Sequence, residues 1–441
     1  MNENSLVKQL KEEGELPEQK VRNFQRKIYL KAKQEKSFRF YSLYDKVCKG
    51  EFIVESYRRV RKNKGAPGID DITFIEIEKD RYKFLHNIYD ELKNRTYRPQ
   101  PIKRVMIEKS NGKMRPLGIP TIKDRVIQMA CKMVIEPIFE ADFENTSYGS
   151  RPKRSAGNAV QNIKENLKAG KTSVYDADLS GYFDTIPHTK LLKTISLRIS
   201  DKNILHLIKM WLKAPINENG KISGGKRNKL GTAQGAVISP LLANVYLHLV
   251  DRMVNKEDGL FKKAGVGIVR YVDDFVLMAN KIPEDVFIKL RNVLNRMELK
   301  INEEKTRLIN STETPFNFLS FTFRYDKDLK GRDKKYWNIV PSEKSCKNIR
   351  KKIDEYLKKK GHQPAKKLVS GLNSKIRGWL NYVSIEKVSY PAVAKRNLRW
   401  YLMDKLNRYY RRKSQRKCKL YGNKAFEKLV EQYGLINPCT Y

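Results

Sequence analysis

Two segments of the chain place aspartates at the end of an apolar run. In the first segment, Asp176 and Asp178 come at the end of a short strand-like run, and a turn containing glycine follows. In the second segment, Asp273 and Asp274 stand between two apolar runs. Turns often carry Asp for backbone reasons alone, so each segment by itself also fits an ordinary turn.

The two segments together favour a metal site. Carboxylates held near one another at buried strand ends repel, and their pKa rises unless a cation neutralises them. Two Mg²⁺ ions about 3.5–4 Å apart would satisfy such a cluster and support phosphoryl transfer. In that chemistry one ion lowers the pKa of an attacking 3′-hydroxyl, and both stabilise the in-line transition state and the leaving pyrophosphate.

The charge of the chain points to a polyanionic partner. The 441 residues include 91 Lys and Arg against 49 Asp and Glu, which leaves a formal net charge of +42. A surface of this kind attracts nucleic acid phosphates, with an anionic membrane as the competing partner. The hydrophobic fraction of 40% is large enough for a folded core, and the length suggests two or three domains.

Several classes of protein are disfavoured. The sequence has no apolar run of 18 residues and its first twenty residues are polar, which argues against a membrane span and a signal peptide. The five cysteines lie far apart without a Cys-x-x-Cys spacing, which argues against zinc knuckles and a disulfide framework. We therefore expect an intracellular protein that handles nucleic acid.

The elements that must position the aspartates can be outlined from the sequence. Residues 1–62 are predicted to be helical and basic, and a turn-rich break follows at 63–68. Strands alternate with helices over 97–325, which predicts an α/β or α+β core. Within it, 102–109 and 114–119 form a predicted hairpin around Asn111-Gly112. A helix over 126–139 is expected to stop near Pro137, and another over 241–253 follows Ser239-Pro240.

The last third of the chain is predicted to be helical. Three helix-length stretches with apolar faces cover 345–360, 366–382 and 393–410. Basic residues and tyrosines alternate in 408–419, beginning with Arg408, Arg411 and Arg412. Basic side chains bind phosphates and aromatic rings stack on bases, so this segment is a candidate strand-binding surface, with a solvated helix end as the alternative.

At this point the motifs resemble those of group II intron-encoded reverse transcriptases. Asp178 with Phe183, and Tyr271-Val272-Asp273-Asp274, resemble motifs A and C of these enzymes. Further matches follow in family order. They are NKGAPGID (63–70), MRPLGIPTIKDRVIQ (114–128), YGSRP (148–152), GTAQGAVISPLLAN (231–244), KINEEKT (300–306), FLSF (318–321) and LNSKIRGWLNY (372–382).

The resemblance implies a role for each matching residue. Asp178 and Asp273 would bridge two Mg²⁺ ions, for which Mn²⁺ could substitute, with Asp274 as a supporting acid and the Leu179 carbonyl as a further ligand. Phe183 would exclude a 2′-hydroxyl from the incoming nucleotide, which implies a DNA product. The other nucleotide-binding residues implied are Lys109, Arg115, Gln234, Gly235 and Lys305. Those implied to bind nucleic acid are Tyr271, Ser320, Arg377, Trp379, Arg408, Arg411 and Arg412.

The chain also departs from the family pattern. The family usually has Ala where this chain has Val272 and Pro where it has Ala233. It usually has Gly where this chain has Ala236 and Ser320. None of these changes removes a metal ligand, so we expect polymerisation to survive. Similar variants occur in group II-like relatives that serve the host. No His-rich or Cys-rich module follows the thumb, so we expect no endonuclease domain.

The resemblance implies an α+β right-hand polymerase. Fingers and a palm with a ferredoxin-like antiparallel sheet would occupy 63–325, after a basic helical extension over 1–62. A helical thumb, or domain X, would occupy 326–441. The expected activity is extension of a DNA or RNA primer with dNTPs on an RNA template. Group II intron RNA is a further possible partner, a membrane is not expected, and we expect a cytoplasmic protein associated with the bacterial nucleoid when on DNA.

Three alternatives remain open on the sequence. A splicing maturase would use the basic surfaces to stabilise intron RNA, and it would not need the aspartates. A host enzyme of DNA repair or phage defence would share the chemistry but use another substrate. A nucleic-acid packaging protein would explain the charge but not the aspartates.

Overall fold

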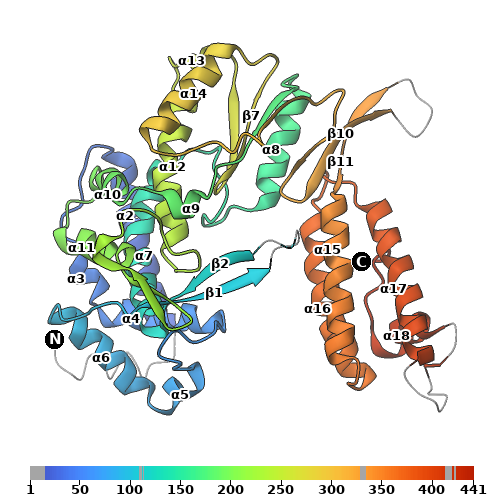
Figure 1. The fold of residues 1–441 in the computed structure, drawn as a ribbon, viewed down its shortest axis with the longest axis horizontal. Helices are drawn as coiled ribbons and strands as arrows, with labels where there is room; N and C mark the ends of the chain where they lie inside the picture. The colour runs from blue at the N-terminus through green and yellow to red at the C-terminus, as the bar shows by residue number, and fades with distance from the viewer. Residues whose placement is uncertain (1–14, 109–111, 113, 328–333, 413–419, 422–423) are drawn as a thin grey trace. The chain divides into compact units, whose positions relative to one another are not determined.

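The computed structural model describes residues 15–108, 112, 114–327, 334–412, 420–421 and 424–441. Contacts divide the chain into two compact units (Figure 1). Unit 1 comprises 1–154, 176–277 and 282–307, and unit 2 comprises 155–175, 278–281 and 308–441. These units interleave along the sequence, and the domain boundaries expected after residues 62 and 325 stay a prediction.

Unit 1 begins with helices that pack on one long helix. These are α2 (Glu15–Gln34), α3 (Tyr44–Val47) and α4 (Gly50–Lys62), which contact α7 (Ile122–Asp142). The ring of Phe24 in α2 meets that of Phe52 in α4 edge-on, with centroids 5.2 Å apart. The helical character predicted for this region is confirmed over the described residues, and the apolar face of α2 is used for packing.

The predicted end of a helix near Pro137 is wrong, because α7 continues through this proline to Asp142. Proline has no backbone N–H, so it leaves the carbonyl four residues earlier, that of Met133, without its helical donor. The side-chain amide of Gln25 in α2 donates to this carbonyl at 2.9 Å. A residue 108 positions away thus replaces the missing bond, and the helix runs on.

The predicted hairpin is present and belongs to a four-stranded sheet of order β2-β1-β4-β5. Its strands are β1 (Ile102–Glu108), β2 (Met114–Ile119), β4 (Pro215–Glu218) and β5 (Lys221–Gly224). β1 pairs antiparallel with β2 and parallel with β4. Most of the turn predicted at Asn111-Gly112 lies outside the described residues. Two helices precede this sheet, α5 (Phe74–Lys79) and α6 (Arg81–Lys93).

A second four-stranded sheet, of order β6-β7-β3-β8, carries the aspartates. Its strands are β3 (Ser173–Ala177), β6 (Gly267–Tyr271), β7 (Asp274–Ala279) and β8 (Arg307–Asn310). The other helical elements of unit 1 are α9 (Tyr182–Thr185), α10 (His188–Ser196), α11 (Lys202–Leu212), η1 (Gly225–Arg227), α12 (Ser239–Asn255), α13 (Leu260–Lys263) and α14 (Glu284–Arg296). Pro240 lies in the first turn of α12, as the sequence predicts.

Unit 2 contains a small sheet and a group of helices. The sheet has the order β11-β10-β9 and is formed by β9 (Phe316–Phe318), β10 (Phe321–Lys327) and β11 (Lys335–Pro341). The helices are α8 (Ala156–Lys168), α15 (Glu343–Lys360), α16 (Ala365–Val383), α17 (Ala392–Arg412) and α18 (Ala425–Tyr433). The three helices predicted after residue 340 are therefore present, as α15, α16 and α17.

The core of these C-terminal helices follows helical spacing. Leu368, Leu372, Ile376 and Leu380 are buried along one face of α16, every fourth residue. Corresponding faces of α15 and α17 contribute Ile349, Ile353, Leu357, Leu398, Leu402 and Leu406 to the same cluster. The predicted α+β class is thus confirmed: sheets in the middle of the chain precede a helical C-terminal part.

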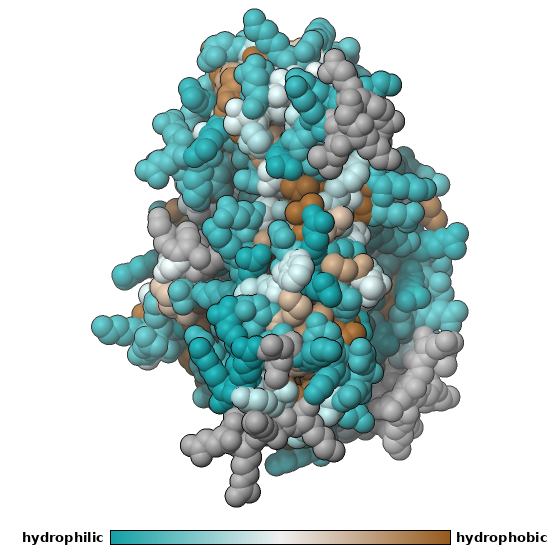
Figure 2. Space-filling model, turned by 90° about the vertical axis from the view of Figure 1, so that its right-hand side faces the viewer, coloured by the Kyte–Doolittle hydropathy of each residue, from teal (hydrophilic) through white to brown (hydrophobic). Residues whose placement is uncertain are grey.

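One face of the molecule is strongly hydrophilic (Figure 2). Figure 2 shows one face, on which hydrophilic residues predominate and hydrophobic ones are scattered between them. Across the described residues, we find no helix with the length and apolar composition needed to cross a membrane.

Candidate active site

Four aspartates come together where neighbouring strands β3 and β7 carry them. Asp176 lies in β3 and Asp178 just after it, while Asp273 lies in the β6–β7 turn and Asp274 begins β7. Burial, followed by repulsion from Asp273, Asp178 and Asp176, raises the pKa of Asp274 to about 7. The structure therefore joins the two segments that are 95 or more positions apart into one acidic site.

Asp176 is a member of this site that the sequence analysis did not assign. Burial and the charge of Asp178 raise its pKa to about 6. Residues i and i+2 of a strand face the same side, so the spacing of Asp176 and Asp178 was a signal for their shared face. The pKa of Asp273 is raised as well, mainly because of burial.

The turn that carries Asp273 is held in an unusual backbone conformation. Val272 has φ +61°, a region that β-branched residues rarely adopt. A Cβ atom at Gly149 would come within 2.6 Å of the Val272 nitrogen, so only glycine leaves space for the turn to pass this closely. The YGSRP segment and the aspartate turn are thus packed directly against each other.

A buried arginine holds the same turn from the interior of the protein. Arg270 is fully buried and forms an ion pair at 2.6 Å with Asp251 of α12, which is also fully buried. It donates further hydrogen bonds to the side chains of Asn244 and Ser147, at 2.9 and 2.7 Å. Its last contact is to the Val272 carbonyl at 2.7 Å, so the guanidinium joins β6, α12 and the aspartate turn.

The segment 300–306 holds Asp178 from the other side. The Asn302 backbone N–H donates to the Asp178 carbonyl at 2.8 Å, and the Asp178 N–H donates to the hydroxyl of Thr306 at 3.3 Å. Lys305 Nζ forms an ion pair with the Asp178 carboxylate at 2.8 Å. Lys305 thus lies at the acidic site, beside the carboxylate rather than away from it.

The acidic site has the donor set of a divalent-cation site. Carboxylate oxygens suit hard cations such as Mg²⁺ and Mn²⁺, and the raised pKa of Asp274 records repulsion that a cation would relieve. No group of three or more His, Cys, Asp or Glu in the described part of the chain is arranged as a ready-made metal cage. The aspartates therefore fit a cation by charge and by the chemistry of their oxygen ligands. In this structure, the ammonium group of Lys305 balances the charge of Asp178.

The predicted nucleotide-binding residues form a second group in unit 1. Arg115 of β2 donates through Nε to the Gln234 side-chain oxygen at 2.7 Å, and the Gln234 amide donates to Asp184 at 3.2 Å. Asp184 follows Phe183, whose half-buried ring meets that of Tyr182 at 5.7 Å. Arg115, Gln234 and the α9 segment are therefore linked, whereas Lys109 lies outside the described residues.

Gly235 and the loop around it explain how these residues are placed. Gly235 has φ +118°, and a Cβ atom there would lie 2.5 Å from the Gly118 carbonyl of β2. The Gln234 carbonyl accepts from the Gly118 N–H at 2.7 Å, and the Thr232 N–H donates to the Phe183 carbonyl at 2.6 Å. The loop 231–236 is thus bonded at once to β2 and to α9.

The predicted nucleic-acid-binding residues fall into different settings. Tyr271 is half-buried at the end of β6, and Ser320 is exposed in the β9–β10 turn with φ +69°. Arg377, Arg411 and Arg412 are exposed, whereas Arg408 is paired with Asp404. Trp379 packs partly on the helical core and donates to the Ser345 hydroxyl at 3.1 Å. Their contacts with nucleic acid stay a prediction.

Comparison with known proteins connects this site to a family. Residues 107–323 match the family described as "Reverse transcriptase (RNA-dependent DNA polymerase)". Residues 346–422 match "Group II intron, maturase-specific domain". "Protein YkfC" of Escherichia coli K12 is 34% identical over 325 residues, which cover 65% of this chain and 84% of that protein. The chain belongs to the group II intron-like reverse transcriptases.

A second relative shows how much of each chain the similarity covers. The "Group II intron-encoded protein LtrA" of Lactococcus lactis subsp. cremoris is 32% identical over 348 residues, and the matched region is 65% of this chain but 57% of that protein. The resemblance inferred from the motifs is confirmed, and with it RNA-directed DNA polymerase activity of the group II-like type. Reverse transcriptases use divalent cations, which accords with the donor set around Asp273.

Proposed function

We propose that this reverse transcriptase extends a primer on an RNA template by two-metal nucleotidyl transfer centred on Asp178, Asp273 and Asp274. The observation that carries the proposal is the convergence of Asp176, Asp178, Asp273 and Asp274 at the ends of β3 and β7, where burial and then their mutual repulsion raise the pKa of Asp274 to about 7. A folded protein keeps such a cluster where a cation is to be bound. Two Mg²⁺ ions, or Mn²⁺ in their place, would supply electrostatic stabilisation of the charge that develops in transfer.

The chain's own residues have distinct roles in this reaction. The primer 3′-oxygen loses its proton to a solvent water molecule and forms a bond to the α-phosphorus, while the bond from that phosphorus to the pyrophosphate oxygen breaks and its electron pair leaves with pyrophosphate. Arg115, held by Gln234, would bind the triphosphate, since a guanidinium matches phosphate oxygens in geometry and charge. Lys305, which is paired with Asp178 at 2.8 Å, would supply a proton to the leaving pyrophosphate.

Primer extension with the purified protein tests this proposal. A DNA primer on an RNA template is supplied with dNTPs and Mg²⁺, and the wild type is compared with Asp273→Ala and with Asp285→Ala. Asp285 is an exposed acid in the first turn of α14, so its loss removes the same charge away from the acidic site. We expect Asp273→Ala to abolish synthesis and keep RNA binding, and Asp285→Ala to leave both unchanged.

The opposite pattern would contradict the proposal. Synthesis by Asp273→Ala at the wild-type rate would exclude this aspartate from the reaction. Loss of RNA binding in Asp273→Ala would show that the substitution disturbs the fold, and Asp178→Asn, which keeps the size of the side chain, would then replace it in the assay.

A splicing function is a second proposal, and the match of residues 346–422 to the maturase-specific domain favours it. In this function the exposed basic residues of the C-terminal helices would bind intron RNA and stabilise its folded state. A splicing assay with a group II intron RNA and the Asp273→Ala variant separates the two functions. Splicing assistance without DNA synthesis in this variant would establish the RNA-binding role on its own.

A further inference from the structure

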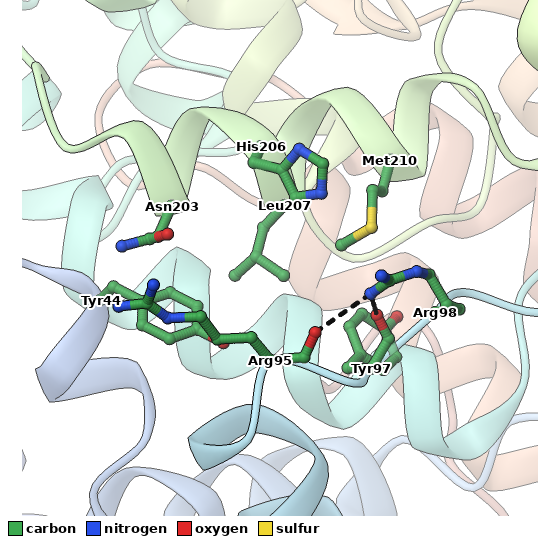
Figure 3. Close-up of a pocket in the computed structure, with 8 residues that line it drawn as sticks. All are labelled: Tyr44, Arg95, Tyr97, Arg98, Asn203, His206, Leu207 and Met210. Atoms are coloured by element: carbon green, nitrogen blue, oxygen red, sulfur yellow. Dashed lines mark hydrogen bonds between the residues drawn. The ribbon is translucent and has the colours of Figure 1, made fainter.

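A polar-rimmed pocket of about 170 Å³ lies in unit 1, formed by the start of α3, the loop after α6 and one face of α11. Figure 3 shows Leu207 projecting from α11 toward the loop that carries Arg95 and Tyr97. The volume is several times the share of one water molecule, about 30 Å³, and below the roughly 300 Å³ of a site for a whole cofactor. The pocket therefore suits one planar ring system.

The floor of the pocket is apolar and rigid. Leu207 is buried, and Tyr97 is 1% exposed, with its hydroxyl donating to Asp124 and accepting from the Trp211 indole N–H. The Tyr44 hydroxyl donates to the Leu92 carbonyl at 2.7 Å, which fixes the other aromatic wall. Both tyrosine hydroxyls are thus used within the protein; the half-buried Tyr44 ring is left to present its apolar surface, whereas the Tyr97 ring closes the floor from inside the protein.

The helix that lines the pocket is anchored by a buried acid. The Asp201 carboxylate accepts from the backbone N–H groups of Leu43 and Tyr44, each at 2.8 Å. It also accepts from the N–H groups of Asn203 and Ile204 at the start of α11. These four backbone N–H groups satisfy the hydrogen-bonding capacity of the Asp201 carboxylate and join α3 to α11. The protein's own contacts therefore hold the walls of the pocket in place.

The rim presents polar groups that the protein itself leaves unused. The guanidinium of Arg95, the side-chain amide of Asn203 and the ring of His206 have no hydrogen-bond or ion-pair partner within the described residues. Arg98 donates from Nη1 to the carbonyls of Arg95 and Tyr97, at 3.2 and 2.7 Å, which holds its guanidinium at the mouth. Two cationic groups and two hydrogen-bonding groups are therefore spread around the rim, with the Arg95 guanidinium on the side of Tyr44 and that of Arg98 on the side of Met210 (Figure 3).

Arg95 stands where the backbone favours glycine. It follows Asn94, the C-cap of α6, and has φ +59°. Glycine is the usual residue just after a helix end in this left-handed conformation, because any Cβ is disfavoured there. Lys64 follows the C-cap of α4 in the same conformation, with φ +47°, so the feature that distinguishes Arg95 is the position of its unpaired guanidinium at the rim of the pocket.

We propose that this pocket binds one unstacked nucleotide of RNA, with its base on the floor of Tyr44 and Leu207 and its phosphate on Arg95 and Arg98. Proteins read single-stranded or bulged RNA by stacking an exposed base on aromatic or apolar surface and hydrogen-bonding its edge. Asn203 and His206 are placed to bond the base edge or the 2′-hydroxyl. The net charge of +42 favours a polyanion over a peptide or a neutral metabolite.

The test compares two RNA hairpins, one with a single bulged purine and one fully paired. Affinities are measured by fluorescence anisotropy with the full chain, in an excess of unlabelled paired hairpin that saturates sequence-independent binding. We expect the wild type to bind the bulged hairpin about tenfold more tightly, within what one stacked base contributes. A 2-aminopurine at the bulge reports directly on insertion of the base. The assay needs no DNA synthesis, so its outcome is independent of the proposed polymerase chemistry.

Arg95→Gly separates a binding role from a structural one. Glycine suits the backbone at this position, so the variant should unfold at the same or a higher denaturant concentration, yet lose the preference for the bulge. Lys387→Gly is the matched control, because Lys387 is also left-handed, with φ +56°, and exposed. It removes the same charge and should keep the preference.

Asn203→Ala gives a second variant that leaves the charge unchanged. The backbone N–H of Asn203, not its side chain, is bonded to Asp201, so the fold should be retained. We expect a partial loss of the preference for the bulge. Equal binding of the two hairpins by the wild type, an unchanged preference in Arg95→Gly, or an equal loss in Lys387→Gly would each overturn the proposal.

Discussion

Arg270 donates a hydrogen bond of 2.7 Å to the carbonyl of Val272, the residue directly before Asp273. The same guanidinium is paired with Asp251, and both side chains are completely buried. A charge pair in the interior costs desolvation energy that its attraction hardly repays, so it is weak evidence for stability as such. Its contact with the aspartate turn points to positioning of Asp273.

Arg270→Met is expected to destabilise the fold by about 3–5 kcal/mol, because it leaves Asp251 buried without a partner. The double variant Arg270→Met/Asp251→Leu removes both charges and should recover much of that stability. Denaturant unfolding and primer extension measure the two effects. We expect the double variant to stay impaired in synthesis, because the Val272 carbonyl still lacks its donor; recovery of both properties would reduce the pair to a structural role.

Val272→Ala tests the strain in the same turn. A β-branched residue at φ +61° is unfavourable, so alanine, the usual family residue, should stabilise the protein by up to about 1 kcal/mol and keep activity. Lys387→Gly is the control, since it relieves a left-handed residue outside the aspartate turn and should leave synthesis unchanged. A large loss of synthesis in Val272→Ala would show that the valine side chain itself is required.

Gly149→Ala should act in the opposite direction. Its new Cβ would lie 2.5 Å from the Val272 side chain and 2.6 Å from the Val272 nitrogen. Since the second contact is with backbone, combining it with Val272→Ala should not restore activity. We expect primer extension to fall sharply in both variants while RNA binding persists; rescue by Val272→Ala would place the clash in the side chain alone.

The raised pKa values predict how stability depends on pH in the absence of divalent cations. A carboxyl whose pKa is raised by folding, to about 7 for Asp274 and about 6 for Asp176, favours the folded state most when it is protonated. This contribution is complete below the unfolded value, near 4, and is lost as the pH rises through 6 to 7. The side chain of Asp274 keeps a solvent-accessible surface although its surroundings are partly desolvated, and solvent screens its charge, so we expect a modest effect.

Unfolding midpoints at pH 5 and pH 8 in a chelator measure this effect. Asp274→Asn should lose less stability than the wild type over that interval, because its side chain does not titrate. Addition of Mg²⁺ or Mn²⁺ at pH 8 should stabilise the wild type more than the variant. Equal pH dependence of the two proteins would contradict the assignment of the raised pKa to Asp274.

How much of this site can be predicted from the sequence depends on how far apart along the chain the contacting residues lie. The aspartates could be predicted from local patterns, because each lies at or close to one end of a strand and the motifs follow a family order. The residues that hold these aspartates in place could not be predicted from local patterns. Lys305 lies 127 positions from Asp178, and Gln25 lies 108 positions from Met133, whose carbonyl Pro137 leaves without a helical donor. Such contacts arise from tertiary packing, and local periodicity carries no record of them.

Phe183→Ala tests whether the ring beside the nucleotide site selects dNTPs. The substitution removes a half-buried ring, whereas the Phe183 carbonyl keeps its bond from the Thr232 N–H and the Tyr182 hydroxyl still anchors α9 to the Ala243 carbonyl. The local backbone should therefore survive. We expect the ratio of kcat/KM for dNTPs over rNTPs to fall by about tenfold or more, since the variant makes room for a 2′-hydroxyl.

Phe183→Tyr is the matched control, because it keeps the ring and should keep the selectivity. Single-nucleotide incorporation on an RNA template, with dNTPs and rNTPs in separate reactions, gives both ratios. A fall in kcat/KM for both nucleotides alike would indicate a packing role for the ring against Tyr182. Unchanged selectivity in Phe183→Ala would show that discrimination against ribonucleotides lies elsewhere, with the loop of Gln234 and Gly235 as the next element to vary.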